Sequence, residues 1–228
     1  MGRAIALELA RRGMDLAIHY NSSEGAADEV VEQARQLGGR AAKYRAELAD
    51  EHAVNAMFDA VTAEFPELAV LVNSAAVFFP TPLETLDGAT WDSVLDVNLK
   101  AYWLCARRAA LHMRPKGRGK IVNIGCVSSK RPWNGYLAYS VSKAGVLMLT
   151  ECLALELAPA IQVNCVAPGT VVFAEQASEA RKTQIRAQIP SGREGDPQDI
   201  ADAVAFFVTG PDYVTGQFLA ADGGRGLR

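Results

Sequence analysis

The stretch YLAYSVSK, residues 136 to 143, carries a tyrosine and a lysine four positions apart, Tyr139 and Lys143. In a helix these two residues lie on one face, so a phenol and an ammonium would converge on one spot. A nearby ammonium favours the phenolate and lowers the pKa of a tyrosine, which suits general acid catalysis near neutral pH. A tyrosine beside a lysine is more often a half-buried ring with a solvated amine, so the rest of the chain must decide.

Composition excludes several classes of protein. The 228 residues are 50% hydrophobic, with 23 basic and 26 acidic side chains and no charge run, so neither a nucleic-acid nor a membrane surface is expected. The cysteines show no CxxC spacing, which predicts reduced thiols rather than disulfides or a metal site: Cys105, Cys126, Cys152 and Cys165. No apolar stretch of ~20 residues and no signal-peptide pattern is found, and we expect a cytoplasmic protein.

Helical and extended patterns alternate along the chain. The predicted helices are Gly2 to Arg12, Ser23 to Gly38, Asp50 to Glu64, Thr90 to Met113, Ala138 to Leu157 and Asp196 to Val208. The predicted strands are MDLAIHY, AAKYRA, LAVLVN, GKIVNIG, IQVNCVAPG and GQFLAADGG. Strands joined by ~10 to 20 helical residues imply right-handed crossovers, so we expect one α/β domain over residues 1–228 with a parallel sheet covered on both faces.

Such sheets bind ligands at the carboxyl ends of their strands. Small residues follow three predicted strands, at Asn73 to Ala76, at Gly125 to Ser129 and at Pro168 with Gly169. Any one of these is an ordinary turn, but their recurrence at successive strand ends favours a binding site. Tyr139 lies just beyond the second of them.

The ordered motifs resemble the short-chain dehydrogenase/reductase family over nearly the whole chain. YSVSK fits its YxxxK motif, NSAA at 73–76 is similar to its NNAG, and VNL at 97–99 carries its helical asparagine. GKIVNIG, APG and ADGG stand at the expected spacings. The resemblance implies a Rossmann-like, doubly wound parallel sheet and an NAD(P)-dependent oxidoreductase that acts on a small carbonyl compound.

The same resemblance assigns roles to single residues. Tyr139 would protonate the carbonyl oxygen, Lys143 would lower the pKa of Tyr139 and hold the nicotinamide ribose, and Asn98 would anchor a proton-relay water. These roles suit the residue types. The dinucleotide groove would be lined by Asn73, Ala75, Gly125, Pro168, Gly169 and Val171.

Cys126 departs from the family pattern, because it stands thirteen residues before Tyr139, where the family has a catalytic serine. A thiol is a weak hydrogen-bond donor and polarises a carbonyl poorly. The site could be degraded, or other groups such as Ser128 could orient the substrate, or Cys126 could simply fill space. Nucleophilic catalysis by Cys126 is not expected, because no histidine lies in a comparable motif.

The start of the chain also departs from the pattern. Family members open with a strand and a TGxxxGIG loop that receives the pyrophosphate at a helix N-terminus. Here Gly2 matches the last glycine of that motif, so the first strand is missing, and we expect an N-terminally truncated domain with weakened cofactor affinity. We expect the neighbours of that strand either to leave a gap or to close together within one parallel sheet.

Cofactor choice depends on the segment after MDLAIHY. It reads YNSS, without the carboxylate that would repel a 2′-phosphate, and Tyr20, Ser22 and Ser23 stand where the adenosine ribose would lie. Arg3 supplies positive charge nearby. NADP(H) is therefore favoured over NAD(H), although Ser22 could instead cap a helix.

The loop AAVFFPTPL, residues 75 to 83, resembles that of bacterial pteridine reductase-like members. Phe78 and Phe79 could stack on a flat, pteridine-like substrate, or could merely pack together. A 3-oxoacyl carrier-protein reductase or another ketone reductase is the alternative, with Thr170 to Pro190 as the substrate lid. The helices at 90–113 and 138–157 predict a homodimer or homotetramer. The competing class is a catalytically impaired, reductase-like protein that binds a nucleotide or a partner.

Overall fold

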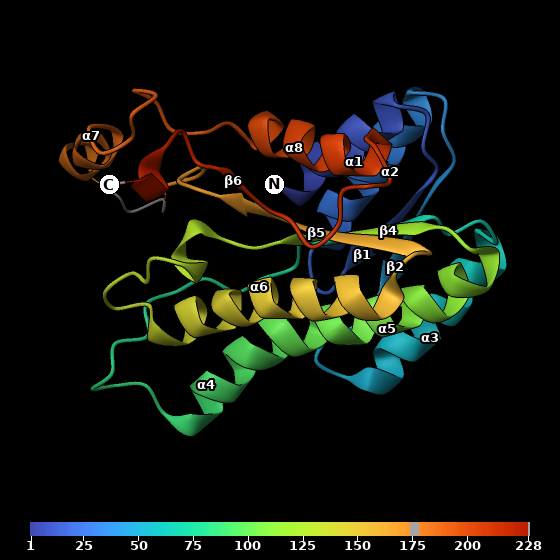
Figure 1. The fold of residues 1–228 in the computed structure, drawn as a ribbon, viewed down its shortest axis with the longest axis horizontal. Helices are drawn as coiled ribbons and strands as arrows, with labels where there is room; N and C mark the ends of the chain where they lie inside the picture. The colour runs from blue at the N-terminus through green and yellow to red at the C-terminus, as the bar shows by residue number, and fades with distance from the viewer. Residues whose placement is uncertain (174–177, 228) are drawn as a thin grey trace.

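The computed structural model describes residues 1–173 and 178–227. Helices and strands alternate along the chain in the predicted order (Figure 1). The helices are α1 (Gly2–Arg11), α2 (Glu24–Gln36), α3 (Glu51–Glu64), α4 (Gly88–Leu95), α5 (Ala101–Met113), α6 (Leu137–Leu157), α7 (Glu179–Arg186) and α8 (Pro197–Thr209). The strands are β1 (Leu16–Tyr20), β2 (Ala41–Arg45), β3 (Val70–Asn73), β4 (Gly119–Ile124), β5 (Ile161–Pro168) and β6 (Phe218–Ala221).

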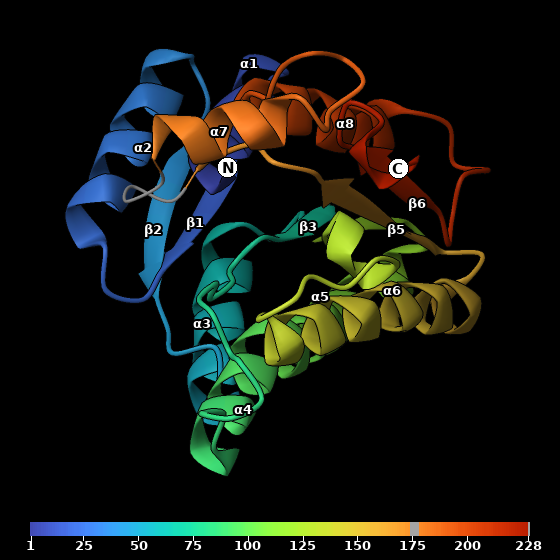
Figure 2. The ribbon, with the colours of Figure 1, turned by 90° about the vertical axis from the view of Figure 1, so that its left-hand side faces the viewer.

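The strands are sandwiched between two helical layers. Helices α1, α2 and α8 cover one face, and α3, α5 and α6 cover the other (Figures 1 and 2). Each layer encloses a separate apolar core, one around Ile5, Ile124 and Val204 and one around Val54, Ala106 and Val163. The near-continuous apolar runs of β4 and β5 follow from this double coverage.

All strand pairs are parallel, as predicted, but they form two sheets rather than one. Strand β1 pairs with β2, and the second sheet has the order β3-β4-β5-β6. Within the described residues, β1 and β3 pair with no strand on their facing edges, so of the two predicted outcomes the gap is the one present, and it divides the parallel strands into two hydrogen-bonded sheets. Helix α1 lies across this gap, where Ile5 and Leu9 pack with Val122 and Ile124 of β4.

The predicted single helix Thr90 to Met113 is interrupted. It begins at Gly88, and a π-helical turn at Asp96–Lys100 separates α4 from α5. Such a turn inserts one extra residue and is common at functional sites. Asn98 lies in it and is fully buried. The apolar periodicity is continuous through this segment and gives no sign of the change.

Helix α6 corrects one expectation drawn from the sequence. Its 21 residues, with mean hydropathy 1.2, meet the length and composition of a membrane span, although no such stretch was expected. It packs on β5 and on the turn Val127–Ser129, and 44% of its most apolar window is buried inside the protein. Buried core helices meet the same criterion. We therefore treat α6 as the helix that carries the candidate catalytic residues.

Candidate active site

Tyr139 and Lys143 lie one turn apart near the N-terminal end of α6, as their spacing predicted. The Lys143 Nζ is 5.9 Å from the centre of the Tyr139 ring and is almost completely buried. It donates to the carbonyl of Ile124 at 2.9 Å and to the Tyr102 hydroxyl at 3.3 Å. The ammonium is therefore fixed at the carboxyl end of β4.

Tyr102 was not among the predicted site residues. Its hydroxyl donates to the Ile124 carbonyl at 3.2 Å and accepts from Lys143, so the three groups form a closed, buried triangle. The signal available in the sequence was a phenol one helical turn after Asn98, in a segment otherwise rich in small and apolar residues. Tyr102 positions Lys143 and satisfies a charge that would be costly to bury alone.

Burial changes the pKa values of both central groups. It raises the pKa of Tyr139 above its usual value, and the neighbouring Cys126, through its negative charge when ionised and a hydrogen bond, raises it further. It lowers the pKa of Lys143 to about 8, against the opposing effect of Cys126. The structure therefore does not show the lowered Tyr139 pKa that the resemblance implied, because desolvation outweighs the nearby ammonium.

The lowered pKa of Lys143 predicts a pH-dependent difference in stability. Its ordinary pKa of 10.5 falls to about 8 in the fold, so the unfolded chain binds the proton more tightly. Relative to a Lys143→Met variant, the native chain should gain about 3 kcal/mol of unfolding free energy as pH rises from 8 to 10.5. Urea unfolding of both proteins across this range measures the gain. A stability difference independent of pH would contradict the assignment.

The side chain of Asn98 makes hydrogen bonds to other residues of the protein. Its Oδ1 accepts from the Val77 amide at 2.8 Å, and its Nδ2 donates to the Val77 carbonyl at 3.0 Å and to Ser142 Oγ at 3.2 Å. The π-helical turn thereby clamps the backbone that leads to Phe78. The proposed anchoring of a relay water by Asn98 stays a prediction.

Cys126 and Ser128 lie together in the turn after β4. The Cys126 sulfur is buried and accepts from the Ser128 amide at 3.4 Å. The Ser128 hydroxyl is buried too, and it has no hydrogen-bond partner within the described part of the chain. A buried hydroxyl without a partner is unusual in a folded protein, and a bound ligand or an ordered water would supply the missing partner. This observation fits Ser128 as a substrate- or cofactor-binding group.

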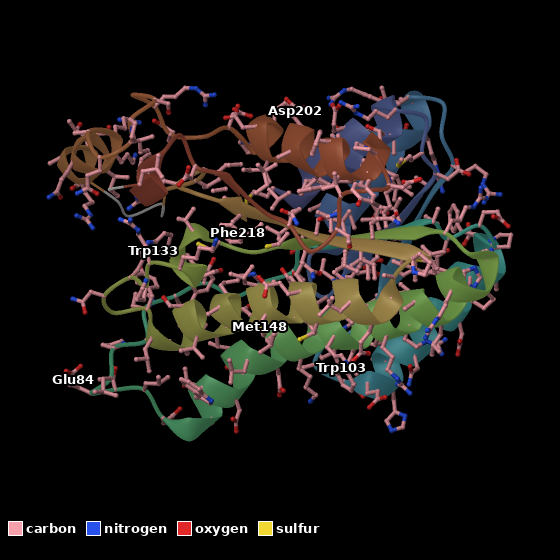
Figure 3. The ribbon with its side chains drawn as sticks, viewed as in Figure 1. Glu84, Trp103, Trp133, Met148, Asp202 and Phe218 are labelled. Atoms are coloured by element: carbon pink, nitrogen blue, oxygen red, sulfur yellow. The ribbon has the colours of Figure 1, made fainter. Side chains whose placement is uncertain are left out.

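The candidate proton donor Tyr139 lies in a cluster with three other aromatic rings. Phe78 lies edge-on to Tyr139 at 4.8 Å and stacks on Tyr136 at 4.8 Å, while Trp133 stacks on Tyr139 at 6.3 Å. Trp133 lies in the loop before α6 (Figure 3). Phe79 makes no ring contact within the described residues and is 39% exposed, so only one of the two predicted phenylalanines joins this cluster.

The predicted groove residues lie at the carboxyl ends of the strands. The Gly125 amide donates to Val166, and the Gly169 amide donates to Ala221. A Cβ on Gly125 would lie 2.6 Å from the Cys165 sulfur, and one on Gly169 would lie 2.7 Å from Asp222 Cβ, so both glycines permit close internal packing. Pro168 is the last residue of β5, and Val171 is buried in the core below.

The start of α1 meets the end of β3. A Cβ on Gly2 would lie 3.7 Å from the Ser74 hydroxyl, which places Gly2 beside Asn73 and Ala75. No side chain caps this helix, so its first amides are open to a ligand. Asn73 itself is used internally, since its Nδ2 donates to Asn123 at 2.9 Å.

The region predicted to receive the adenosine ribose is more highly charged than expected. Arg3 pairs with Glu29 at 2.7 Å, and the Tyr20 hydroxyl donates to Glu24 at 3.2 Å. Lys43, which was not predicted, bonds to Glu24 at 2.9 Å and lies over the Tyr20 ring. The expected absence of a carboxylate here is therefore wrong.

Two serines complete this region. Ser23 is the N-cap residue of α2, but its side chain makes no capping hydrogen bond. Ser22 precedes it and is exposed. Neither hydroxyl is used in capping the helix, which leaves both as candidates for binding the ribose or its phosphate.

Comparison with known proteins places these features in a family. The family model described as Enoyl-(Acyl carrier protein) reductase matches residues 1–225. The 3-oxoacyl-[acyl-carrier-protein] reductase FabG of Staphylococcus aureus (strain Mu50 / ATCC 700699) is 37% identical over 228 residues, covering 98% of this chain and 93% of that protein. The chain belongs to the short-chain dehydrogenase/reductase family. It is an NAD(P)-dependent oxidoreductase of that family.

Other members of the short-chain dehydrogenase/reductase family agree. The 3beta-hydroxysteroid dehydrogenase 1 of Eggerthella lenta is 37% identical over 235 residues, covering 100% of this chain and 90% of that protein. Among solved structures, acetoin dehydrogenase YohF from Salmonella typhimurium superposes with a TM-score of 0.89 at 32% identity, covering 98% of this chain and 90% of that one. A Serratia marcescens short-chain dehydrogenase/reductase mutant superposes with a TM-score of 0.91 at 33% identity, covering 98% of this chain and 92% of that one. The Rossmann-like fold is thus confirmed.

Proposed function

We propose that the protein reduces a carbonyl group with NADPH, and that Tyr139 donates the proton. The observation that carries this is the buried Lys143 ammonium, fixed beside a partly exposed Tyr139 at the carboxyl end of β4. When bound, the dinucleotide supplies the hydride that the carbonyl carbon receives. The uncapped start of α1 and the orphaned Ser128 hydroxyl are observations that fit such a ligand.

Each residue of the site has a definite task in this proposal. Gly2 and the first turn of α1 hold the pyrophosphate, Lys143 binds the nicotinamide ribose, and the main chain of Val171 meets the carboxamide. Asn98 keeps the Val77 backbone, and with it Phe78, in place. Ser128 and Cys126 orient the carbonyl, the first with a hydroxyl and the second with a weaker thiol donor.

The choice of NADPH over NADH is supported by Arg3, Lys43, Ser22 and Ser23. The ion pair of Arg3 with Glu29 opposes it, but the two side chains are 50% and 62% exposed, so that pair contributes little and can open. A 2′-phosphate carries more charge than one carboxylate and would compete well for Arg3.

The ring cluster supports one substrate class over others. Phe78, Trp133 and Tyr136 form an apolar, aromatic surface beside Tyr139, which favours a flat substrate such as an aryl ketone or a pteridine. Similarity to FabG supports a 3-oxoacyl substrate as the alternative. The nucleotide-binding, catalytically impaired alternative is favoured by one observation, the raised pKa of Tyr139 beside Cys126.

The experiment is a steady-state assay of nicotinamide oxidation. NADPH and NADH are each supplied with aryl ketones, a dihydropteridine and a 3-oxoacyl thioester. We expect carbonyl-dependent oxidation with a higher kcat/KM for NADPH. Binding of NADPH without turnover of any carbonyl would instead support the impaired alternative.

We also propose that two copies or more associate through α5 and α6. Several large apolar side chains on these helices are exposed: Trp103, Leu111, Met148 and Leu155. Figure 3 shows Trp103 and Met148 on this helical layer. Contiguous exposed apolar surface of this kind marks protein interfaces.

Light scattering at micromolar concentration should give the mass of a dimer or tetramer. A Met148→Glu variant should shift that mass toward the monomer, because the carboxylate would be buried without a partner. An exposed residue elsewhere, Tyr213→Glu, serves as the control. A native chain that stays monomeric would contradict the proposal. The cytoplasm is the proposed location, since all four cysteines are free thiols.

A further inference from the structure

Arg225 places a positive charge at the edge of the aromatic cluster. It lies in the C-terminal turn Arg225–Leu227 and is partly buried, with its guanidinium carbon 5.4 Å from the centre of the Trp133 ring. Its Nη1 donates to the Thr170 hydroxyl. Among residues 1–173 and 178–227, no carboxylate forms an ion pair with it. Figure 3 shows Trp133 beneath the C-terminal turn.

The nearby carboxylate, Asp222, is used for another purpose. Its two oxygens accept from the amides of Gly224 at 2.9 Å and of Gly226 at 2.6 Å, so it shapes the turn that presents Arg225. Arg181 on α7 adds a second positive charge. Burial lowers the pKa of Arg225 and repulsion by Arg181 lowers it further, against the attraction of Cys126 and Asp222.

Within the part of the chain that the structure describes, Arg225 lacks the carboxylate partner that partly buried charges normally have. A guanidinium withdrawn from water is costly unless it is paired, and its planar fork matches a carboxylate. Thr170 satisfies only one of its donors, and the Trp133 face attracts the cation without filling its hydrogen bonds. An anion held here would accept hydrogen bonds from the remaining donors of Arg225.

The position of Arg225 relative to Tyr139 suits an anion that belongs to the substrate. Trp133 contacts both, stacking on the Tyr139 ring at 6.3 Å and lying under the Arg225 guanidinium. The charge is thus one aromatic ring away from the proton donor. A molecule that spans this distance would place a carbonyl at Tyr139, a flat body on the rings and an acid group on Arg225.

We propose that Arg225 binds a carboxylate of the substrate, so that the enzyme prefers carbonyl compounds that carry a carboxylate and a flat apolar body. This inference rests on the proposed carbonyl reduction. The carbonyl carbon gains the hydride of NADPH, and the carbonyl oxygen gains the Tyr139 proton. The products are NADP⁺ and a hydroxy acid whose carboxylate is unchanged. Tyr139 is reprotonated from solvent.

The test compares an acid with its own ester. 4-Carboxybenzaldehyde and its methyl ester share the ring and the carbonyl and differ in charge. The ratio of their kcat/KM values is measured for the native chain, for Arg225→Met and for Arg225→Lys. Arg114→Met, which removes the same charge from an exposed turn after α5, is the matched control.

We expect the native enzyme and Arg114→Met to favour the acid, and Arg225→Met to lose this preference by ~10- to 100-fold, the usual effect of a hydrogen bond to a charged group. Arg225→Lys should recover part of it. Ester reduction should be nearly the same in all four proteins. If every protein reduces the ester and none favours the acid, the inference is wrong and the carbonyl reductase remains.

A binding measurement tests Arg225 without turnover. Calorimetric titration of the native chain should give tighter binding of benzoate than of benzamide, and Arg225→Met should abolish the difference. Equal binding of the two compounds by the native chain would overturn the inference. Failure of every carbonyl to be reduced, with benzoate still favoured, would overturn the proposed reaction and retain the anion site.

Discussion

Replacing Tyr139 with phenylalanine is expected to lower kcat/KM for carbonyl reduction by ~10²- to 10⁴-fold, the usual contribution of general acid catalysis. The phenylalanine ring keeps the contacts with Phe78 and Trp133, so the fold and the substrate surface should survive. The loss should appear in kcat rather than in KM, because only proton donation is removed. Steady-state kinetics of the variant measure the loss in kcat, and a circular dichroism spectrum shows whether the fold is kept.

Tyr136→Phe is the matched control for this experiment. It removes the same hydroxyl from a ring of the same cluster, three residues upstream on the chain. Its activity should stay within about threefold of the native value, the ordinary spread of such effects. If Tyr139→Phe retained more than a tenth of the native activity, another group would have to supply the proton.

Replacing Cys126 with serine should raise turnover by ~10-fold or more, because a preorganised hydroxyl donor at a developing oxyanion is worth up to 10²- to 10³-fold. The thiol hydrogen-bonds to Tyr139 and contributes to the raised pKa of that residue. The added hydroxyl is smaller than the thiol and fits the same turn. The same assay, with NADPH and the best carbonyl, measures the gain.

Cys152→Ser is the control for this change, because Cys152 is an exposed thiol on the same helix as Tyr139. It should leave turnover unchanged. A Cys126→Ser variant with lower activity than the native chain would show that the thiol is not a degraded serine. The orphaned Ser128 hydroxyl would then be the donor that orients the carbonyl, and Ser128→Ala would be the damaging variant.

The order of elements was predictable because each helix and strand carries its own periodicity. The pairing of Leu16 with Ala41 and of Val70 with Lys120 follows from parallel crossovers, which the alternation of elements implies. The π-helical turn around Asn98 was not predictable, since an extra residue in a helix changes no apolar pattern. The sequence predicted that the neighbours of the missing strand would leave a gap or close together, and the choice of the gap depended on contacts between distant segments.

The site was predictable where one helix sets the geometry, as for Tyr139 and Lys143. Tyr102, Trp133 and Arg225 were missed, because each reaches the site only through tertiary packing. The direction of the Tyr139 pKa shift was missed for the same reason. Charge and spacing can be read from a sequence, whereas the depth at which two groups are buried cannot.

The gap between β1 and β3 gives the molecule an unusual thermal property. Within the described residues, no ladder hydrogen bond joins the two sheets. Apolar packing on both faces holds them together, through α1 and α8 with β4 on one face and through α3 with α5 on the other. Hydrophobic contacts weaken on cooling, whereas backbone ladders do not depend on that effect. We therefore expect the packing across this gap to be the part of the fold that loosens first in the cold.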